Sequence, residues 1–404
     1  MNKYVLLAVT LLVALAAIVA CVPAPTPTPV PAKPTDVPKP TEAPKPTVAP
    51  TKAAEPTKAP EPTKAPAATA VPTKAAEPTK APEPTKAAVA PTPTTAPMKC
   101  EKMANPPTVA AGQPGAPDKP IVITFVPSGD TAKIAKGGDQ IAECLNKITG
   151  LTFAPVSVGT TFAASIEAMG ANKAQIGFLN TFSVLLARQK YDIDPALAVM
   201  RKYNTNAIDP DKADAGKLTA YYKGQFIAKK DSGIKTYADL KGKSFCFVDP
   251  NSTSGYIIPQ IVLKANGINP DKDLKAVVNA GSHNNVGLGV YKGDCDAGVS
   301  YVDVLTDAAA NLAKTFPDIA DKVVPFALTE KIPNDGVQFV KGFDPKVKAA
   351  IVDGLVAMAK DPGGNAVLRS IYTIDDFQKI DTSFYAEFEN VLKKAGVDPA
   401  ALVK

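Results

Sequence analysis

The chain has 404 residues, with 45 Lys and Arg against 39 Asp and Glu and a net charge of +6. Residues 22–97 hold nine Lys and six acids, and one further Lys lies in the first 21 residues, so residues 98–404 carry only +2. A near-neutral domain lacks the basic surface that binding of DNA or RNA requires, and we expect no nucleic-acid partner.

Residues 1–21 form a predicted targeting segment. Lys3 precedes the apolar run Val5–Ala20, which is shorter than the roughly 20 residues that a membrane-spanning helix needs. The run ends in Ile18-Val19-Ala20-Cys21, which resembles a bacterial lipobox. This resemblance implies cleavage before Cys21, lipidation of this cysteine and an extracytoplasmic protein anchored to the bacterial membrane, at the cell surface or in the periplasm. The alternative is an uncleaved membrane anchor.

Residues 22–97 form a predicted linker, which holds 22 of the 40 prolines. A unit close to Glu-Pro-Thr-Lys-Ala-Pro recurs in it, and large apolar side chains are almost absent. Such a segment cannot offset the entropy cost of ordering, so we expect a disordered, partly polyproline-like tether. A role as a cell-wall or partner-binding stalk remains open.

The chain contains five cysteines, and four remain for disulfides if Cys21 is lipidated. An even number suits an oxidising compartment, and four cysteines allow three pairings. We favour Cys100–Cys144, which would tie the end of the linker to the first helix, together with Cys246–Cys295, which would join two strands. The cysteines and the one histidine lack zinc-site spacing, so we predict no metal and no cofactor.

Strand and helix patterns alternate after residue 120. In chain order, the sequence predicts strands or extended segments at 121–126, 151–158, 175–179, 221–229, 244–248, 276–279, 297–301 and 322–328, with helices at 134–148, 163–170, 237–242, 257–266 and from 283. This alternation predicts an α/β fold with a mainly parallel sheet flanked by helices in each of two domains. Ligands of such folds bind at the carboxyl ends of the strands.

Five loops follow predicted strands, at 127–131, 180–183, 249–255, 280–285 and 301–303. One of them contains Ser252-Thr253-Ser254-Gly255 before a helix, where hydroxyls either cap the helix or help to bind an anion. His283 begins another predicted helix, and it is either an anion donor or an ordinary structural histidine. Because these loops contain no arginine, hydroxyls, backbone N–H groups and helix dipoles would hold the anion, which suits a tetrahedral oxyanion.

These residues resemble the solute-binding proteins of phosphonate, phosphite and phosphate ABC transporters, which are type II periplasmic binding proteins. The motifs that carry the resemblance include Asp249–Tyr256, Gly281–His283 and Ile332–Asp335. The others are Pro127-Ser128 with Leu145–Leu151, Lys230–Ile234, Ala238–Lys243 and Gly293–Ala297. The resemblance implies a two-lobed clamshell, with lobe one at 98–226 plus 334–404 and lobe two at 227–333.

The resemblance also implies a set of ligand-binding residues. Ser252, Thr253, Ser254 and His283 would hold the oxyanion, and Asp303 and Asp335 would face an amino group or other substituent. The other predicted ligand-binding residues, taken from the loops and from the resemblance, are Ser128, Phe162, Thr181, Tyr222 and Tyr301. Phe162 replaces an expected tyrosine, and residues 180–182 depart from the usual loop, so the pocket wall around the substituent differs from the family pattern.

The predicted function is capture of a phosphorus oxyanion by a monomer, followed by delivery to an ABC permease. The chain has no phosphate-binding G-x-x-x-x-G-K-[ST] motif, so the ATPase would lie on another chain. One alternative is a ligand sensor of the same fold. Another is a hydrolase that uses Ser252 or Ser254 with His283 and Asp303, although the sequence around these serines lacks G-x-S-x-G. We therefore expect no enzymatic activity.

Overall fold

The computed structural model describes residues 96–399. The predicted signal peptide, the lipidated Cys21 and nearly all of the predicted linker lie outside the described residues, as do residues 400–404. Within the described range, none of the helices has both the length and the apolar composition that a membrane crossing needs.

A seven-stranded sheet combines segments from both ends of the described range. Its strands follow the order β14-β4-β13-β3-β1-β2, and β5 pairs with β4. Their bounds are β1 Ile123–Phe125, β2 Ser157–Val158, β3 Ile176–Leu179, β4 Asp194–Lys202, β5 Leu218–Thr219, β13 Gly336–Phe339 and β14 Asp376–Lys379. Every residue of β1 and β3 is buried, as expected for central strands that are covered on both faces.

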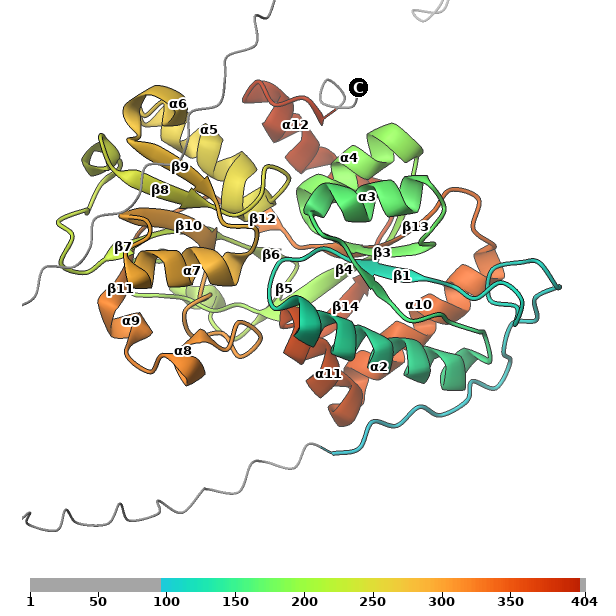
Figure 1. The fold of residues 1–404 in the computed structure, drawn as a ribbon. Coiled ribbons are helices and arrows are strands. Elements are labelled where there is room, and N and C mark those ends of the chain that lie inside the picture. Colours follow the sequence, from blue (N-terminus) through green and yellow to red (C-terminus); the bar gives the residue numbers. More distant parts are fainter. Residues whose placement is uncertain (1–95, 400–404) are drawn as a thin grey trace, which may run out of the picture. The chain divides into compact units, whose positions relative to one another are not determined.

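Helices cover both faces of this sheet (Figure 1). One face carries α2 (Thr131–Thr149), α10 (Pro345–Lys360) and α11 (Pro362–Tyr372), and the other carries α3 (Phe162–Gly170), α4 (Thr181–Tyr191) and α12 (Ala386–Lys394). Local signals set the bounds of α2. Asp130 accepts a hydrogen bond from the Lys133 N–H at its start, and Gly150 ends it with a φ of 74°.

The second sheet has five strands in the order β11-β7-β10-β8-β9. Their bounds are β7 Gly224–Lys229, β8 Ser244–Phe247, β9 Ala276–Asn279, β10 Ala297–Tyr301 and β11 Val323–Leu328. One face carries α5 (Ile258–Ala265) and α6 (Pro270–Asp273), and the other carries α7 (His283–Lys292), α8 (Leu312–Thr315) and α9 (Ile319–Lys322) (Figure 1). A π-helical turn, η3 (Thr253–Ile257), precedes α5, and short 3₁₀ turns lie at η1 Lys212–Asp214, η2 Tyr237–Leu240 and η4 Thr382–Tyr385.

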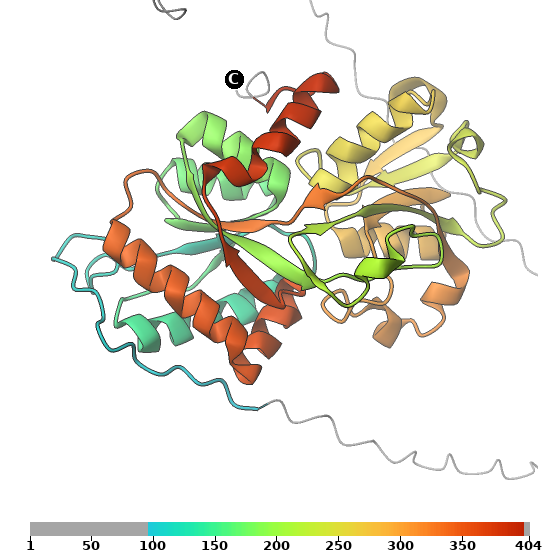
Figure 2. The same ribbon diagram turned by 180° about the vertical axis from the view of Figure 1, so that it is seen from behind.

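The chain crosses between the two sheets through β6 (Tyr221–Tyr222) and returns through β12 (Ile332–Pro333). These two strands pair antiparallel, with Tyr222 opposite Ile332. The crossings can be followed from behind in Figure 2. The two crossings therefore lie side by side, which is the arrangement of a two-strand hinge.

The sheets are mixed, which differs from the mainly parallel sheets that the sequence predicted. β1 is parallel to β2 and β3, and β8 is parallel to β9 and β10. By contrast, β13 is antiparallel to β3 and β4, and β7 is antiparallel to β10 and β11. β7 and β13 directly follow the crossings. Because each crossing enters a sheet at the edge where the parallel strands end, the next strand must run in the opposite direction.

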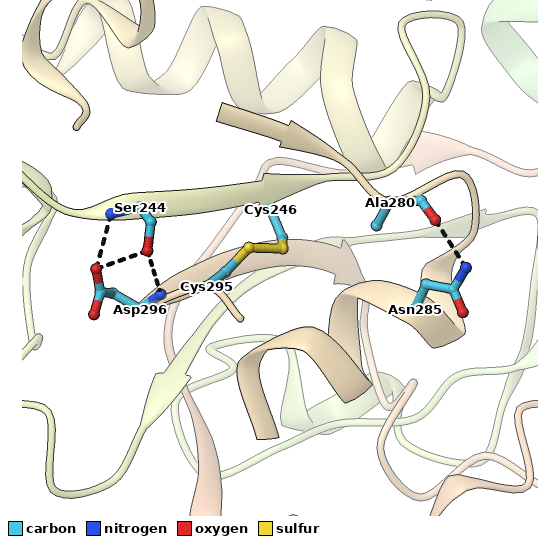
Figure 3. The surroundings of a disulfide bond; sticks show 6 residues. All are labelled: Ser244, Cys246, Ala280, Asn285, Cys295 and Asp296. Carbon is cyan, nitrogen blue, oxygen red and sulfur yellow. Dashed lines mark hydrogen bonds between the residues drawn. A yellow bond between two sulfur atoms is a disulfide. The ribbon is translucent and has the colours of Figure 1, made fainter. Parts of the chain in front are cut away.

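Both disulfides have the pairing that we favoured from the sequence, Cys100–Cys144 and Cys246–Cys295. Cys246 lies on β8, and Cys295 lies two residues before β10 begins (Figure 3). Beside this bond, the Asp296 carboxylate accepts hydrogen bonds from the Ser244 N–H and hydroxyl, both at 2.8 Å. The disulfide and these hydrogen bonds hold the neighbouring parallel strands together at their starts, opposite the ends that bear the loops.

Candidate functional site

A cavity of about 90 Å³ lies where loops from the two sheets meet. The predicted ligand-binding residues that line it are Ser128, Phe162, Tyr222, Ser252, Thr253, Ser254, His283, Tyr301, Asp303 and Asp335.

Thr181 is the predicted site residue that lies outside the cavity lining. It is fully buried in the first turn of α4, and its hydroxyl donates to the Pro333 carbonyl at 2.6 Å. Thr181 therefore fixes α4 to the return crossing and does not face the space that a ligand would fill.

The turn at residues 252–255 follows β8 and is buried throughout. The Ser252 hydroxyl accepts a hydrogen bond from the Gly255 N–H at 3.2 Å, so Ser252 does cap the following helical turn. A side chain at Gly255 would place its Cβ 2.3 Å from a Val248 methyl group. This close packing holds the turn against the end of β8, and Ser252 and Ser254 line the cavity.

Thr253 links the turn to the other sheet. Its hydroxyl oxygen accepts hydrogen bonds from the Asn180 side-chain amide and from the Phe182 N–H, both at 2.9 Å. The Asn180 amide also donates to the Asn251 carbonyl at 2.9 Å. Asn180 and Phe182 lie at the start of α4, which packs on the seven-stranded sheet. The Thr253 hydroxyl thus joins the two halves of the site.

His283 is a buried, neutral hydrogen-bond donor. Burial and the nearby Arg201 charge lower its pKa to about 3. Its Nδ1 accepts from the Tyr301 N–H at 3.3 Å and lies 2.9 Å from the Ser300 hydroxyl. Because Nδ1 acts as an acceptor, the ring proton resides on Nε2. Nε2 lies 3.4 Å from the Ser252 hydroxyl, so this N–H group and the turn converge on one place.

Two carboxylates of the cavity lining lie close together after β10. Asp307 accepts hydrogen bonds from the Tyr301 hydroxyl at 2.8 Å, the Thr373 hydroxyl at 2.7 Å and the Ala309 N–H at 3.0 Å. Asp303 accepts a hydrogen bond from the Asn204 amide. Burial, together with the charge of Asp307, raises the pKa of Asp303 to about 7.

This raised pKa predicts a measurable pH dependence of stability. The pKa of Asp303 is about 7 in the folded state, against an ordinary value near 3.9 in the unfolded state, so the native protein keeps its proton while the unfolded chain loses it. The contribution of Asp303 to stability therefore falls as pH rises from about 4 to 7, by at most about 1.4 kcal/mol per pH unit. The free energy of unfolding of wild type and of Asp303→Asn can be measured with denaturant between pH 4 and 7. The difference between the two should change with pH, whereas a constant difference would contradict the assignment.

Arg201 is a functional candidate that the sequence analysis missed. It lies on β4 and lines the cavity, with its side chain 18% exposed. Its Nη1 donates to Asn334 at 2.8 Å, and its Nη2 donates to the Asp335 carboxylate at 3.0 Å. Asp335, expected to face a ligand substituent, lines the cavity; its Oδ2 pairs with Arg201, and among the described residues its buried Oδ1 has no hydrogen-bond partner.

Further lining residues outside the predicted set include Lys202, Tyr203, Asn204, Asp307 and Tyr372. Three of these follow Arg201 directly in the sequence. The apolar run Ala196–Val199 before them has the pattern of a buried strand, so applying the strand-end rule there would have found this group.

The geometry does not form the catalytic triad of a hydrolase. In the described part of the chain, His283 forms no hydrogen bond to a carboxylate, because its Nδ1 contacts Ser300 and Tyr301. A Ser–His nucleophile needs an acid that orients the imidazole from this nitrogen. The same part of the chain, residues 96–399, also lacks any group of three or more His, Cys, Asp or Glu side chains suited to a metal ion.

Residues 123–385 match the model of a family described as the periplasmic substrate-binding proteins of phosphonate ABC transporters. The chain belongs to this family. Its members bind transport substrates outside the cytoplasm and are not enzymes, so the hydrolase hypothesis is rejected.

Two curated relatives match part of the chain. The phosphate-import protein PhnD of Mycolicibacterium smegmatis is 27% identical over 207 residues, which are 50% of this chain and 59% of that protein. The phosphonates-binding periplasmic protein of Escherichia coli is 31% identical over 157 residues, which are 37% of this chain and 44% of that protein. The chain thus spans about half the length of these relatives, whose names give two different cargoes.

Solved structures support the fold. A binding-protein component of an ABC phosphonate transporter from Pseudomonas aeruginosa has a TM-score of 0.59 at 19% identity and covers 68% of this chain and 86% of its own. PhnD1 from Prochlorococcus marinus, solved with methylphosphonate, has a TM-score of 0.57 at 17% identity and covers 68% of this chain and 98% of its own. The predicted fold of this chain, the two-lobed α/β fold of periplasmic binding proteins, is therefore confirmed.

Proposed function

We propose that this family member captures a phosphorus oxyanion, either a phosphonate, phosphite or phosphate, and delivers it to the permease of an ABC importer. The observation that carries the proposal is the convergence of the Ser252–Ser254 hydroxyls, the His283 Nε2–H and the Arg201 guanidinium on one small cavity. Hydroxyl and N–H donors from several directions match the acceptor pattern of a tetrahedral oxyanion.

The two sheets would be the cores of the lobes, with lobe one at 98–226 plus 334–404 and lobe two at 227–333. The paired crossing strands β6 and β12 would act as the hinge. Thr253 from lobe two contacts Asn180 and Phe182 from lobe one, so the turn at residues 252–255 would also take part in closure. A bound oxyanion would favour the closed state because it contacts both lobes.

The N-terminal region would position this binding unit at the membrane. In this proposal, Cys21 is lipidated and residues 22–97 tether the monomeric binding unit near its permease. The Cys100–Cys144 disulfide and a 3.1 Å hydrogen bond from the Lys99 N–H to Asp361 attach the end of the tether to the helices of lobe one. Lobe two would then remain free to rotate about the hinge.

Thermal unfolding of the full-length protein against a panel of anions tests this function. The panel contains phosphate, phosphite, methylphosphonate, sulfate and methylsulfonate. A ligand at 100 times its Kd adds about 2.7 kcal/mol to the stability, which raises Tm by several degrees. We expect a rise with at least one phosphorus oxyanion and none with the sulfur anions. An unchanged Tm with every phosphorus oxyanion would reject the proposal.

A further inference from the structure

Asn180 brings an unpaired acceptor atom to the cavity lining. It is the N-cap residue of α4 and is 6% exposed, but its side chain does not cap the helix. The Phe182 N–H, which the oxygen of an asparagine N-cap ordinarily accepts, donates instead to the Thr253 hydroxyl. Among the described residues, the buried Oδ1 of Asn180 has no hydrogen-bond partner. Leaving such an acceptor unpaired costs free energy, which a donor on a ligand would recover.

Contacts with lobe two fix the orientation of the Asn180 amide. Its Nδ2 donates to the Asn251 carbonyl and to the Thr253 hydroxyl oxygen, both at 2.9 Å. A carbonyl oxygen can only accept a hydrogen bond, so the nitrogen of the amide, and not its oxygen, must face Asn251. The unpaired atom of the side chain is therefore the acceptor Oδ1.

The same contacts make the Thr253 hydroxyl a donor. Its oxygen accepts from Asn180 Nδ2 and from the Phe182 N–H, and these two bonds use both of its lone pairs. Its own proton is left for a third group, and Thr253 lines the cavity. A donor hydroxyl and an acceptor amide oxygen thus lie on two side chains that are directly hydrogen-bonded to each other.

The charge of the acceptor decides which ligand group suits it. The other buried, unpartnered acceptor among the described lining residues is Asp335 Oδ1, on a carboxylate that already pairs with Arg201. Asn180 carries no net charge, so its oxygen can accept from an O–H group of an anion without repulsion between two net charges. A fully ionised oxyanion has acceptors alone, whereas a monoprotonated one carries an O–H group.

We propose that Asn180 is a specificity-determining residue, whose Oδ1 accepts a hydrogen bond from the O–H group of a monoprotonated phosphorus oxyanion while Thr253 donates to another ligand oxygen. This inference rests on the proposed function. A sulfonate has the same tetrahedral shape but no O–H group, so it would leave Oδ1 buried and unpaired. A site built to hydrogen-bond a ligand hydroxyl rejects an analogue that lacks it far more strongly than an apolar site does.

The matched ligand pair methylphosphonate and methylsulfonate isolates the effect of the O–H group. At about pH 5, below the second pKa of a phosphoryl group, both ligands carry one negative charge. Isothermal titration of the full-length protein at this pH, with displacement titrations for the weaker ligand, should give a Kd at least a hundredfold lower for methylphosphonate. In Asn180→Leu, which removes the amide but retains a side chain of similar shape, the ratio of the two Kd values should fall at least tenfold.

Thr253→Val is the matched control. It removes the hydrogen bond between Asn180 Nδ2 and Thr253, but it leaves Oδ1 in place and the amide bonded to the Asn251 carbonyl. This variant should weaken binding of both ligands alike and keep the wild-type ratio. A change in the ratio therefore reports the acceptor, whereas a parallel change in both Kd values reports the contact between the lobes.

Asn180→Ser is a second variant in case Asn180→Leu does not fold, because serine is also a preferred N-cap residue and lacks the amide oxygen. It should show the same fall in the ratio. If wild type binds phosphate or phosphite but not methylphosphonate, that ligand is compared with methylsulfonate instead, because the change in the ratio between variants is decisive. Equal binding of the two ligands by wild type, or the wild-type ratio in both Asn180 variants, would overturn the inference and leave the proposed function standing. Absence of binding of methylphosphonate, phosphite and phosphate alike would overturn both.

Discussion

Thr253→Val is expected to weaken binding of the phosphorus oxyanion by roughly 1–3 kcal/mol, which is about fivefold to more than a hundredfold in Kd. Valine keeps the shape of threonine but removes the hydroxyl that accepts from Asn180 and from the Phe182 N–H. Both hydrogen bonds are buried, and an unpaired N–H at the start of α4 would oppose closure of the lobes. The variant therefore loses the contact between the lobes as well as a hydroxyl that could donate to a ligand oxygen.

Isothermal titration with the best ligand of the anion panel measures this effect, and Thr253→Ser is the matched control because it keeps the hydroxyl. The serine variant should bind within a fewfold of wild type. Small-angle scattering of the ligand-saturated proteins should show a larger population of the open form in Thr253→Val. Binding curves of Thr253→Val that overlay those of wild type would show that this hydroxyl contributes neither to the ligand site nor to closure.

His283→Ala should also cost at least tenfold in Kd. The ring supplies the Nε2–H donor beside Ser252, and its tautomer is fixed by the Tyr301 N–H. Its pKa of about 3 predicts that the donor remains neutral from pH 5 to 8. The difference in binding free energy between wild type and His283→Ala should therefore be constant across this range.

Comparison of the two proteins at each pH cancels the titration of the ligand itself. His283→Gln is the control, because its amide keeps an N–H donor on a side chain of similar length and should recover part of the affinity. A difference that appears only below pH 6.5 would mean that the imidazolium binds the ligand. Superimposable titrations of wild type and His283→Ala would mean that His283 is a structural residue.

The fold could be predicted where local patterns were strong. The apolar run Ser244–Val248, followed by Asp249-Pro250-Asn251, marked a strand and its end, and the structure places β8 at Ser244–Phe247. The rule that ligands bind at the ends of parallel strands brought together residues as distant as Ser128 and Asp303, which share one cavity. These predictions needed only periodicity and turn chemistry.

Other features depend on long-range contacts that a single sequence does not reveal. β4 lies between β13 and β14, which both come from the C-terminal part of the chain, so its local sequence does not reveal its neighbours in the sheet. Likewise, Thr181 resembles a ligand donor at a helix start, but its hydroxyl is used by the Pro333 carbonyl of the return crossing. Local sequence shows which groups can donate, whereas tertiary structure decides which partners they meet.

A crystal structure of the protein with the tightest-binding phosphorus oxyanion would test the central claim most directly. Our account predicts that the phosphorus lies in the cavity between the lobes, with its oxygens within about 3 Å of the Ser252 and Ser254 hydroxyls and of His283 Nε2. It also predicts a hydrogen bond from Arg201 to the ligand. A ligand bound elsewhere, or a ligand in this cavity that does not contact the 252–254 turn, would contradict the account.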